Sequence, residues 1–332
     1  MSGRLKLRRG TVVSADPLLV EVEGERRPAW ADEVLLGPMR EGDEVVVNVE
    51  ALDLNLGSGG FDIVHLNLTR GLSGGGAEGD AHVMKLNYTP LQHSIKPVEE
   101  GSRSAPRPVL VLPLHGHLAP AAWAVAQASP GLRVGYVQTA GGALPGSLSR
   151  DVKHLRERDL LAGHVTAAPA FGGEGEAIST VGAIEAAGSL DWDAVIVGPG
   201  PGIIGSNTEL GHGGMAALES AHAALSVRCP TIISPRLSSS DPRERHRGLS
   251  HHTRTVLDLM LAPVDVAVPE NQPDIARELE TSEHRLHLTP VDLNGYAASN
   301  LPTKSMGRSL ADDPLFFSAP LAAGTHLARV AS

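Results

Sequence analysis

Between residues 108 and 270, short β-branched apolar runs alternate with longer stretches of helical periodicity, and this alternation limits the folds open to the chain. The expected strands are residues 109–113, 133–138, 164–168, 194–198, 231–234 and 264–268. Helices are expected between them, near residues 118–128, 147–160, 175–187, 213–227 and 250–262. Parallel strands joined by helical crossovers need helices on both faces of the sheet. The sequence therefore predicts a doubly wound, mostly parallel α/β sheet of the Rossmann-like class.

The first part of the chain has a different pattern, with short alternating runs that are broken by turn residues. These runs are residues 9–15, 18–23, 29–36, 43–52 and 61–68. Strands at such close spacing are typical of small barrels and sandwiches. We therefore expect a small N-terminal domain of the β-barrel or sandwich type.

These changes of pattern divide the chain into four expected segments. They are a β-rich domain over residues 1–75, a linker over 76–104, the α/β domain over 105–270 and an extension over 271–332. Glycines at residues 71–81 predict a flexible loop near the start of the linker. The extension contains Phe316 and Phe317, and we expect it to pack on the α/β domain as a helix because aromatic side chains favour burial.

Composition and charge limit the kinds of molecule that the chain is expected to bind. The formal net charge is -10, so the long-range field disfavours binding to nucleic acid or to an anionic membrane. The single cysteine, Cys229, excludes an intrachain disulfide and is consistent with a reducing compartment. We expect a cytoplasmic protein whose partner is a small-molecule ligand. The sequence leaves open whether the chain forms a homo-oligomer.

Polar, glycine-bearing loops follow the predicted strands, at the edge where open α/β sheets bind their ligands. The longest runs from Gly198 to Thr208 and follows a buried apolar strand. Glycines allow a backbone to approach a ligand where a side chain would block it. The predicted ligand-binding residues of these loops are Gly141, Gly142, Gly172, Gly173, Gly200, Gly202, Gly205, Ser206 and Thr208.

Gly200, Gly202 and Gly205 spell the G-x-G-x-x-G pattern of dinucleotide-binding proteins. The pattern fits that function poorly, because Pro201 stiffens the loop and helical sequence resumes only near Gly213. The loop is not a phosphate-binding loop of the Walker type either, because no glycine-lysine pair with a serine or threonine after it follows these glycines. The sequence therefore identifies no cofactor.

Residues 234–253 concentrate guanidinium and imidazole groups. Guanidinium groups bind carboxylates and phosphates through paired hydrogen bonds. Ser250 is placed to cap a helix whose first turn would hold two histidines, and there the helix dipole disfavours the imidazolium form. A neutral imidazole can accept a proton. We therefore assign ligand binding to Arg236, Arg243, Arg245 and Arg247, and catalysis to His246, His251 and His252.

The glycine loop and this later loop are expected to face each other. Segments 194–198 and 231–234 follow one another as strands, and we expect them to lie side by side in the sheet. The first loop would contribute backbone N–H groups and the second would contribute positive charge and a helix N-terminus. Together they predict an anion-binding pocket.

Three functions remain open on these observations. The favoured function is an enzyme acting on a small anionic metabolite, phosphate-bearing or nucleotide-like, at the carboxyl edge of the sheet. One alternative is a non-catalytic ligand-binding or regulatory protein. Another is a metal-dependent hydrolase, for which His115 and His117 have the H-x-H spacing of strand-end metal ligands.

Six segments, taken together, resemble the bacterial family known only as domain of unknown function 3866. They span about residues 85–317 and read MKLNYTPLQ, TAGGALPGSLSRDVKHL, APAFGGEGEAIST, VGPGPGIIGSNTELGHGG, DPRERHRGLSHHT and ADDPLFF. No activity is established for that family. The resemblance therefore supports the boundaries of the polar loops and assigns no reaction.

Overall fold

The computed structural model describes residues 4–56, 59–76, 79–100, 105–206, 208–280 and 282–332. The chain divides into two compact units, residues 1–82 and 83–332, and each is described by itself. Among the described residues, no helix has both the length and the apolar character needed to cross a membrane.

The first unit is a closed five-stranded barrel, which confirms the β-barrel predicted for the N-terminal part of the chain. In barrel order its strands are β1 (Leu7–Ala15), β2 (Leu18–Val22), β3 (Glu25–Trp30), β5 (Asp62–Asn67) and β4 (Glu44–Asn48). The β3–β5 pair is parallel and the other pairs are antiparallel. Alternate side chains point inward, so that Val12, Val20, Val45 and Val47 fill the barrel.

Residues 29–36, predicted as one strand, are a strand only at their start. Strand β3 ends at Trp30, and the short helix α1 (Glu33–Leu36) follows. The carboxylate of Asp32 caps this helix by accepting a hydrogen bond from the Val34 N–H at 3.1 Å. This local cap turns the chain away from the sheet. A second short helix, α2 (Glu50–Asp53), follows β4.

The second unit is built on an eight-stranded sheet in which every neighbouring pair is parallel. Across the sheet the strands are β11 (Gly175–Ala177), β10 (Gly163–Ala167), β9 (Val134–Thr139), β12 (Ala194–Pro199), β8 (Val109–Val111), β13 (Thr231–Ile233), β16 (Asp265–Pro269) and β17 (Arg285–Thr289). The predicted α/β class with a mostly parallel sheet is confirmed, and strands β8 and β12 pair directly.

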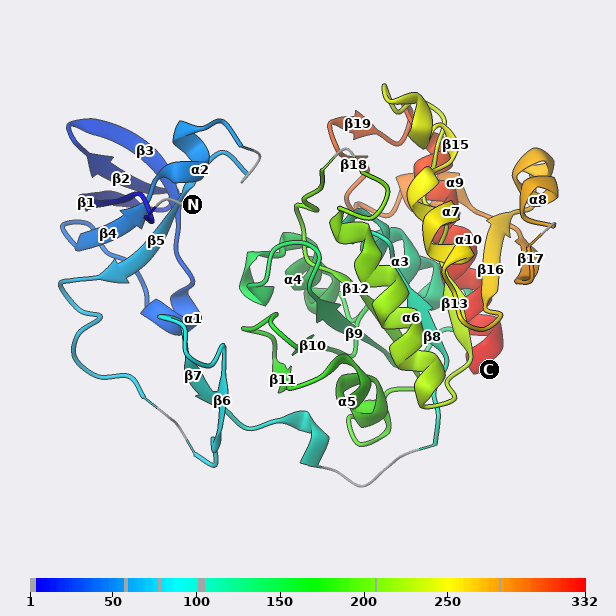
Figure 1. The fold of residues 1–332 in the computed structure, drawn as a ribbon, viewed down its shortest axis with the longest axis horizontal. Coiled ribbons are helices and arrows are strands. Elements are labelled where there is room, and N and C mark those ends of the chain that lie inside the picture. The colour runs from blue at the N-terminus through cyan, green and yellow to red at the C-terminus, as the bar shows by residue number, and fades with distance from the viewer. Residues whose placement is uncertain (1–3, 57–58, 77–78, 101–104, 207, 281) are drawn as a thin grey trace. The chain divides into compact units, whose positions relative to one another are not determined.

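Helices cover both faces of this sheet (Figure 1). One face carries α3 (Leu118–Ala128), α4 (Arg150–Glu157), α9 (Leu293–Ala297) and α10 (Pro314–Ala331); the other carries α5 (Thr180–Glu185), α6 (Ala216–Ser226), α7 (His251–Asp258) and α8 (Pro273–Leu279). Successive strand residues point to opposite faces. Leu110 therefore joins the core beside α3 and α10, while Val109 joins the core beside α5 and α6.

The C-terminal residues form α10, which packs closely on α3. Phe316 and Phe317 are buried in this contact region. A Cβ atom at Gly324 would lie 2.2 Å from the backbone oxygen of Ala121, so only glycine allows the two helices to approach this far.

The order of two strands differs from the expectation. Segments 194–198 and 231–234 are not neighbours, because β12 is inserted between β9 and β8 and so leaves β8 between β12 and β13. Consecutive strands usually lie side by side, but this insertion separates them.

Residues 175–187, predicted as a helix, begin instead with the short edge strand β11. The carboxylate of Glu176 accepts hydrogen bonds from Thr166 Oγ1 at 2.8 Å and from the Gly172 N–H at 2.6 Å. These bonds hold the segment extended against β10 before helix α5 begins.

The segment expected as a linker contains ordered elements of the second unit. These are the hairpin β6 (Val83–Lys85) and β7 (His93–Ile95), followed by a single 3-10 turn, η1 (Val98–Glu100). Residues 77–78, within the expected flexible loop, and residues 101–104 lie outside the described residues.

Candidate functional site

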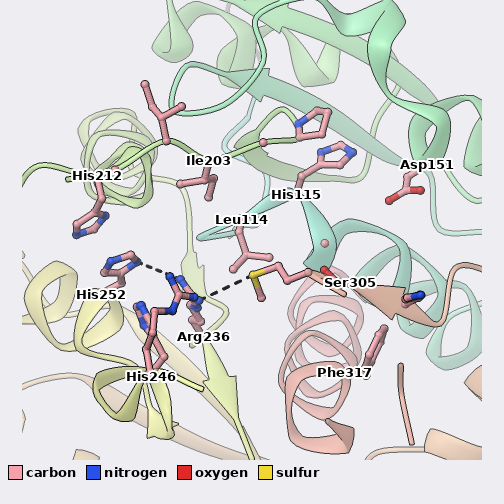
Figure 2. A pocket seen from close by; sticks show the side chains of 18 of the residues that line it. Leu114, His115, Asp151, Ile203, His212, Arg236, His246, His252, Ser305 and Phe317 are labelled. Atoms are coloured by element: carbon pink, nitrogen blue, oxygen red, sulfur yellow. Dashed lines mark hydrogen bonds between the residues drawn. The ribbon is translucent and has the colours of Figure 1, made fainter. Parts of the chain in front are cut away.

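A cavity of about 570 Å³ lies at the carboxyl edge of the sheet. The chain leaves β8 toward α3 on one face, whereas it leaves β12 toward α6 on the opposite face. Loops that diverge in this way open a crevice at the topological switch point of a parallel sheet. The cavity is lined by residues that follow β8, β12 and β13, and by residues that precede α10 (Figure 2).

The loop after β13 folds back because β14 (Leu237–Ser238) pairs with β15 (Gly248–Leu249). This arrangement buries Arg236, which is 5% exposed and lines the cavity. Its guanidinium donates to His252 Nδ1 at 3.3 Å and to Asp241 Oδ2 at 3.4 Å (Figure 2 draws the first of these bonds). Burial lowers the pKa of Arg236 to about 10, so the group remains charged at neutral pH.

Asp241 balances the positive charge of this region. It is fully buried and accepts hydrogen bonds from Arg236, from Arg243 at 3.0 Å and from Arg308 at 3.3 Å. Burial acts to raise the pKa of Asp241, but the hydrogen bonds from Arg243 outweigh it and hold the pKa well below its ordinary value. One ionised carboxylate thus holds three guanidinium groups together.

Four imidazole rings pack together next to Arg236. The His212 and His252 rings are stacked with their centroids 3.5 Å apart, while His251 and His246 lie 4.3 and 4.7 Å from His252. Ser250 caps α7, as the sequence predicts, by accepting from the His252 N–H. Its hydroxyl also pairs with His246 Nδ1 at 2.7 Å.

All four rings are held in the neutral form. Burial lowers the pKa of His246 to about 3 and that of His252 to about 2, and the nearby Arg236 adds to both shifts. Burial also lowers the pKa values of His212 and His251. Both ring nitrogens of His212, Nε2 of His246 and Nε2 of His251 have no hydrogen-bond partner among the described residues. Such nitrogens can accept a proton or bind a metal ion.

Eight of the residues predicted for ligand binding or catalysis line the cavity. They are Gly202, Gly205, Ser206, Arg236, Arg243, Arg245, His246 and His252. Of the predicted loop wall from Gly198 to Thr208, residue 207 lies outside the described residues.

Other predicted residues are used within the fold. A Cβ atom at Gly142 would lie 2.1 Å from the oxygen of Gly200, and one at Gly141 would lie 2.4 Å from the oxygen of Gly213. These three predicted glycines, Gly141, Gly142 and Gly200, therefore allow the loops to pack against one another.

The remaining predicted binding residues are also engaged by other parts of the protein. The N–H groups of Gly172 and Gly173 donate to Glu176 and Thr166, respectively. Thr208 pairs with the hydroxyl of Ser206. Arg247 donates to the backbone oxygen of Asp241 at 2.9 Å. His251 belongs to the histidine cluster but is not among the residues that line the cavity.

The strand-end histidines proposed as metal ligands are bonded to the protein. His115 lines the cavity, and its ring pairs with Ser149 Oγ at 2.7 Å and with the Pro199 oxygen at 3.2 Å. His117 is fully buried, with Nδ1 3.0 Å from Ser234 Oγ, and burial lowers its pKa to about 3. Among the described residues, neither belongs to a group of three neighbouring metal-ligating side chains.

Such a group is formed instead by His246, His251 and His252, whose ligand atoms lie within 4.8 Å of one another. The two unpartnered Nε2 atoms of His246 and His251 fit a metal ion, because burying a polar atom without a partner is unfavourable. The charged Arg236 beside His252 opposes a bound cation. The cluster can therefore serve either as a proton-accepting group or as a metal centre.

One wall of the cavity was not predicted from the sequence. Lys304, Ser305 and Met306 belong to a hairpin formed by β18 (Lys304–Ser305) and β19 (Arg308–Ser309). Met306 and Gly307 both have positive φ angles, 48° and 79°. The Met-Gly pair between two polar runs was the available signal, since two-residue hairpin turns favour glycine at the second position.

A family model described as a protein of unknown function, DUF3866, matches residues 29–324. The match includes every residue that lines the cavity. No curated protein and no solved structure matches the chain.

Proposed function

The chain belongs to the DUF3866 family, and from this starting point we propose that it is an enzyme that acts on a small anionic metabolite in the cavity. The observation that carries this proposal is the buried Arg236 guanidinium, which lines the cavity in direct contact with the neutral ring of His252. A fixed positive charge beside a neutral imidazole combines the two functions such an enzyme needs. The charge binds the anion, and the neutral imidazole cluster around His252 accepts a proton.

The charges around the cavity support an anionic ligand. Arg236, Arg243, Arg245 and Lys304 line it, and Asp151 is the acidic residue among the lining side chains. Guanidinium groups match the geometry of phosphate and carboxylate oxygens. A volume of about 570 Å³ suits a metabolite of nucleotide size or smaller.

The strand order supports the position of the site. We infer that the sheet is of the doubly wound, Rossmann-like type, in which ligands bind where successive crossovers pass to opposite faces. The helices that follow the paired strands β8 and β12 lie on opposite faces, and the cavity lies beyond the carboxyl ends of these two strands.

His246 is the proposed proton acceptor, with His252 and His212 beside it: it lines the cavity, its Nδ1 pairs with Ser250 Oγ, and its Nε2 has no hydrogen-bond partner among the described residues. His252 has no free lone pair, because its Nδ1 accepts from Arg236 and the proton of its neutral ring is on Nε2. Proton transfer to this cluster would place a charge near Arg236, and an anionic substrate would offset that charge. The arrangement favours a reaction in which a proton leaves a substrate that carries its own negative charge.

Thermal unfolding of the full chain with inorganic phosphate, pyrophosphate or nucleoside monophosphates tests anion binding. We expect a saturable rise in the melting temperature with at least one of these anions. Arg236→Met should weaken that binding by about 2 to 5 kcal/mol, the scale for losing one partner of a buried charged pair. Arg247→Ala is the matched control and should bind normally, since Arg247 does not line the cavity.

Turnover of the binding anion, or of its esters, separates an enzyme from a ligand sensor. His246→Asn should reduce turnover far more than it reduces binding. A bound anion that is never transformed would support the regulatory alternative. If no anion shifts the melting temperature, or if the shift persists in Arg236→Met, the proposal is wrong.

A metal-dependent hydrolase is the second candidate, because Nε2 of His246 and Nε2 of His251 are buried and find no hydrogen-bond partner in the part of the chain that the structure describes. His246, His251 and His252 would hold the ion, and a bound ion would supply an activated water. Hydrolysis of a nitrophenyl phosphate ester should then disappear after chelation and return with Zn²⁺. Hydrolysis that survives chelation would exclude this candidate.

A further inference from the structure

Two histidines and an aspartate from three separate elements meet on the face of the sheet that α10 covers. Asp265 begins β16, His287 lies in β17 and His326 lies in α10. In the parallel register, Ala267 pairs with His287, so that the side chains of Asp265 and His287 point to the same face. Helix α10 packs on that face and brings His326 to them.

The distances between these groups are those of ligands around one ion. Asp265 Oδ2 lies 3.2 Å from His326 Nε2 and 3.3 Å from His287 Nε2. Ligand atoms bound tetrahedrally to Zn²⁺ at about 2.0 to 2.1 Å are about 3.3 Å from one another. The two imidazole rings stack with centroids 4.0 Å apart, and all three ligand atoms lie within 4.8 Å of one another.

Nε2 of His287 gives an independent indication that these side chains share a ligand. This atom is buried and has no hydrogen-bond partner among the described residues, although a carboxylate oxygen lies 3.3 Å away. The nitrogen and the oxygen are close but not aligned for a hydrogen bond. Two lone pairs directed toward a shared point would produce this arrangement.

The surroundings fix the ligands for binding. Arg285 Nε donates to Asp265 Oδ1 at 2.6 Å, which orients the carboxylate so that Oδ2 faces the two rings and pairs with His326 Nε2 at 3.2 Å. A bound ion would replace this hydrogen bond. Arg285 and Arg329 are the cationic groups nearby, and both reduce the affinity for a cation.

We propose that Asp265, His287 and His326 form a binding site for a divalent transition-metal ion, with Zn²⁺ as the expected ion. Three protein ligands leave a fourth position for water. Asp265 is the first residue of its strand, so the site lies at the amino end of β16, whereas the cavity lies at the carboxyl edge. A bound ion would tie α10 to the sheet, independently of the function proposed above.

Zinc binding to the full chain, after treatment with a chelator, tests the site. Competition with a chromophoric chelator gives the number of bound ions and their affinity, with Zn²⁺ alone as the probe. The double variant His287→Ala, His326→Ala should bind one Zn²⁺ fewer than the wild type, and its melting temperature should rise less on adding Zn²⁺. The double variant His246→Ala, His251→Ala should retain the ion assigned here.

A change at a histidine outside both clusters, His154→Ala, is the control and should bind Zn²⁺ as the wild type does. The proposal is overturned if the wild type binds no Zn²⁺, or if the His287→Ala, His326→Ala variant binds as many ions with unchanged affinity. If that variant does not fold, His287→Ala alone decides the matter, because its side chain is 36% exposed. It should then bind Zn²⁺ at least about tenfold more weakly, and an unchanged affinity would refute the site.

Discussion

Asp241 is the residue around which three arginines gather. Arg236, Arg243 and Arg308 all donate to its carboxylate, which is inaccessible to solvent. Charges of one sign at such close range repel one another strongly where water is excluded. The positive charge available to a ligand in the cavity therefore depends on a carboxylate that is not among the residues lining the cavity.

Replacing Asp241 by asparagine keeps its shape and removes its charge. We expect Asp241→Asn to lower the free energy of unfolding by about 3 to 5 kcal/mol, because the buried Arg236 loses the carboxylate to which it donates, whereas Arg308 keeps Asp313. Urea denaturation measures this change. Glu244→Gln removes an exposed carboxylate from the same loop and should cost less than about 0.5 kcal/mol. Equal stability of the two variants would contradict the role given to Asp241.

At the residue scale, the sequence predicted which kinds of side chain form the site, but it did not predict which distant residues they would contact. The arginines and histidines of residues 234–253 were identifiable by their density. Arg308 was not, because it reaches Asp241 across 67 positions of chain through the tertiary fold. The Asp265, His287 and His326 cluster was missed for the same reason, since its members are separated in sequence and joined by sheet register and helix packing.

At the scale of elements, the glycine-rich loops after β9 and β12 pack against each other. The loop after β9 packs on the loop after β12, and the Ala143 N–H donates to the Pro201 oxygen at 2.7 Å. Cβ atoms at Gly142 and Gly200 would collide with the facing backbone. This contact positions residues 201–206, which form one wall of the cavity.

Gly142→Ala should force these two loops apart, because its Cβ would lie 2.1 Å from the Gly200 oxygen. We expect a loss of about 1 to 3 kcal/mol in unfolding free energy. Amide hydrogen exchange at Ala143 should also accelerate, since its bond to Pro201 is strained. Ser147→Ala, at an exposed position nearby, should change neither quantity. Unaltered exchange at Ala143 in Gly142→Ala would show that the loops do not depend on this contact.

Most strands could be predicted from local apolar runs in the sequence, whereas the order of the strands in the sheet could not. Residues 109–113 and 194–198 were recognisable because parallel strands covered on both faces need continuous apolar runs. The strand Gly175–Ala177 has no such run and is held by the hydrogen bonds of Glu176. The position of β12 beside β8 results from pairing between strands that are far apart in the sequence, and no local sequence pattern predicts that pairing.

At the scale of the whole molecule, the second unit buries several histidines in neutral form. His117 and His164 are buried, and burial lowers the pKa of each to about 3. Burial also lowers the pKa values of His246 and His252. In an unfolded chain these rings titrate at about 6.5, so folding requires each of them to give up a proton when the solution is acidic.

Stability should therefore fall as the pH drops from about 6.5 toward 3. In this window the unfolded chain binds protons that the folded chain does not, and the full contribution is present only above about pH 6.5. His117 and His164 should each contribute a slope of up to about 1.4 kcal/mol per pH unit. Urea denaturation between pH 7.5 and 4.5 measures the sum.

His117→Asn isolates one of these contributions, because asparagine can still pair with Ser234 but does not titrate. Between pH 6.5 and 4.5, the unfolding free energy of the variant should change less steeply with pH than that of the wild type, by up to about 1.4 kcal/mol per pH unit. Carboxylates with lowered pKa values, such as Asp241 and Asp313, act in the same direction only below about pH 4, so they do not obscure this window. An identical slope in wild type and variant would mean that His117 is protonated in the folded chain, contrary to its burial beside Phe316.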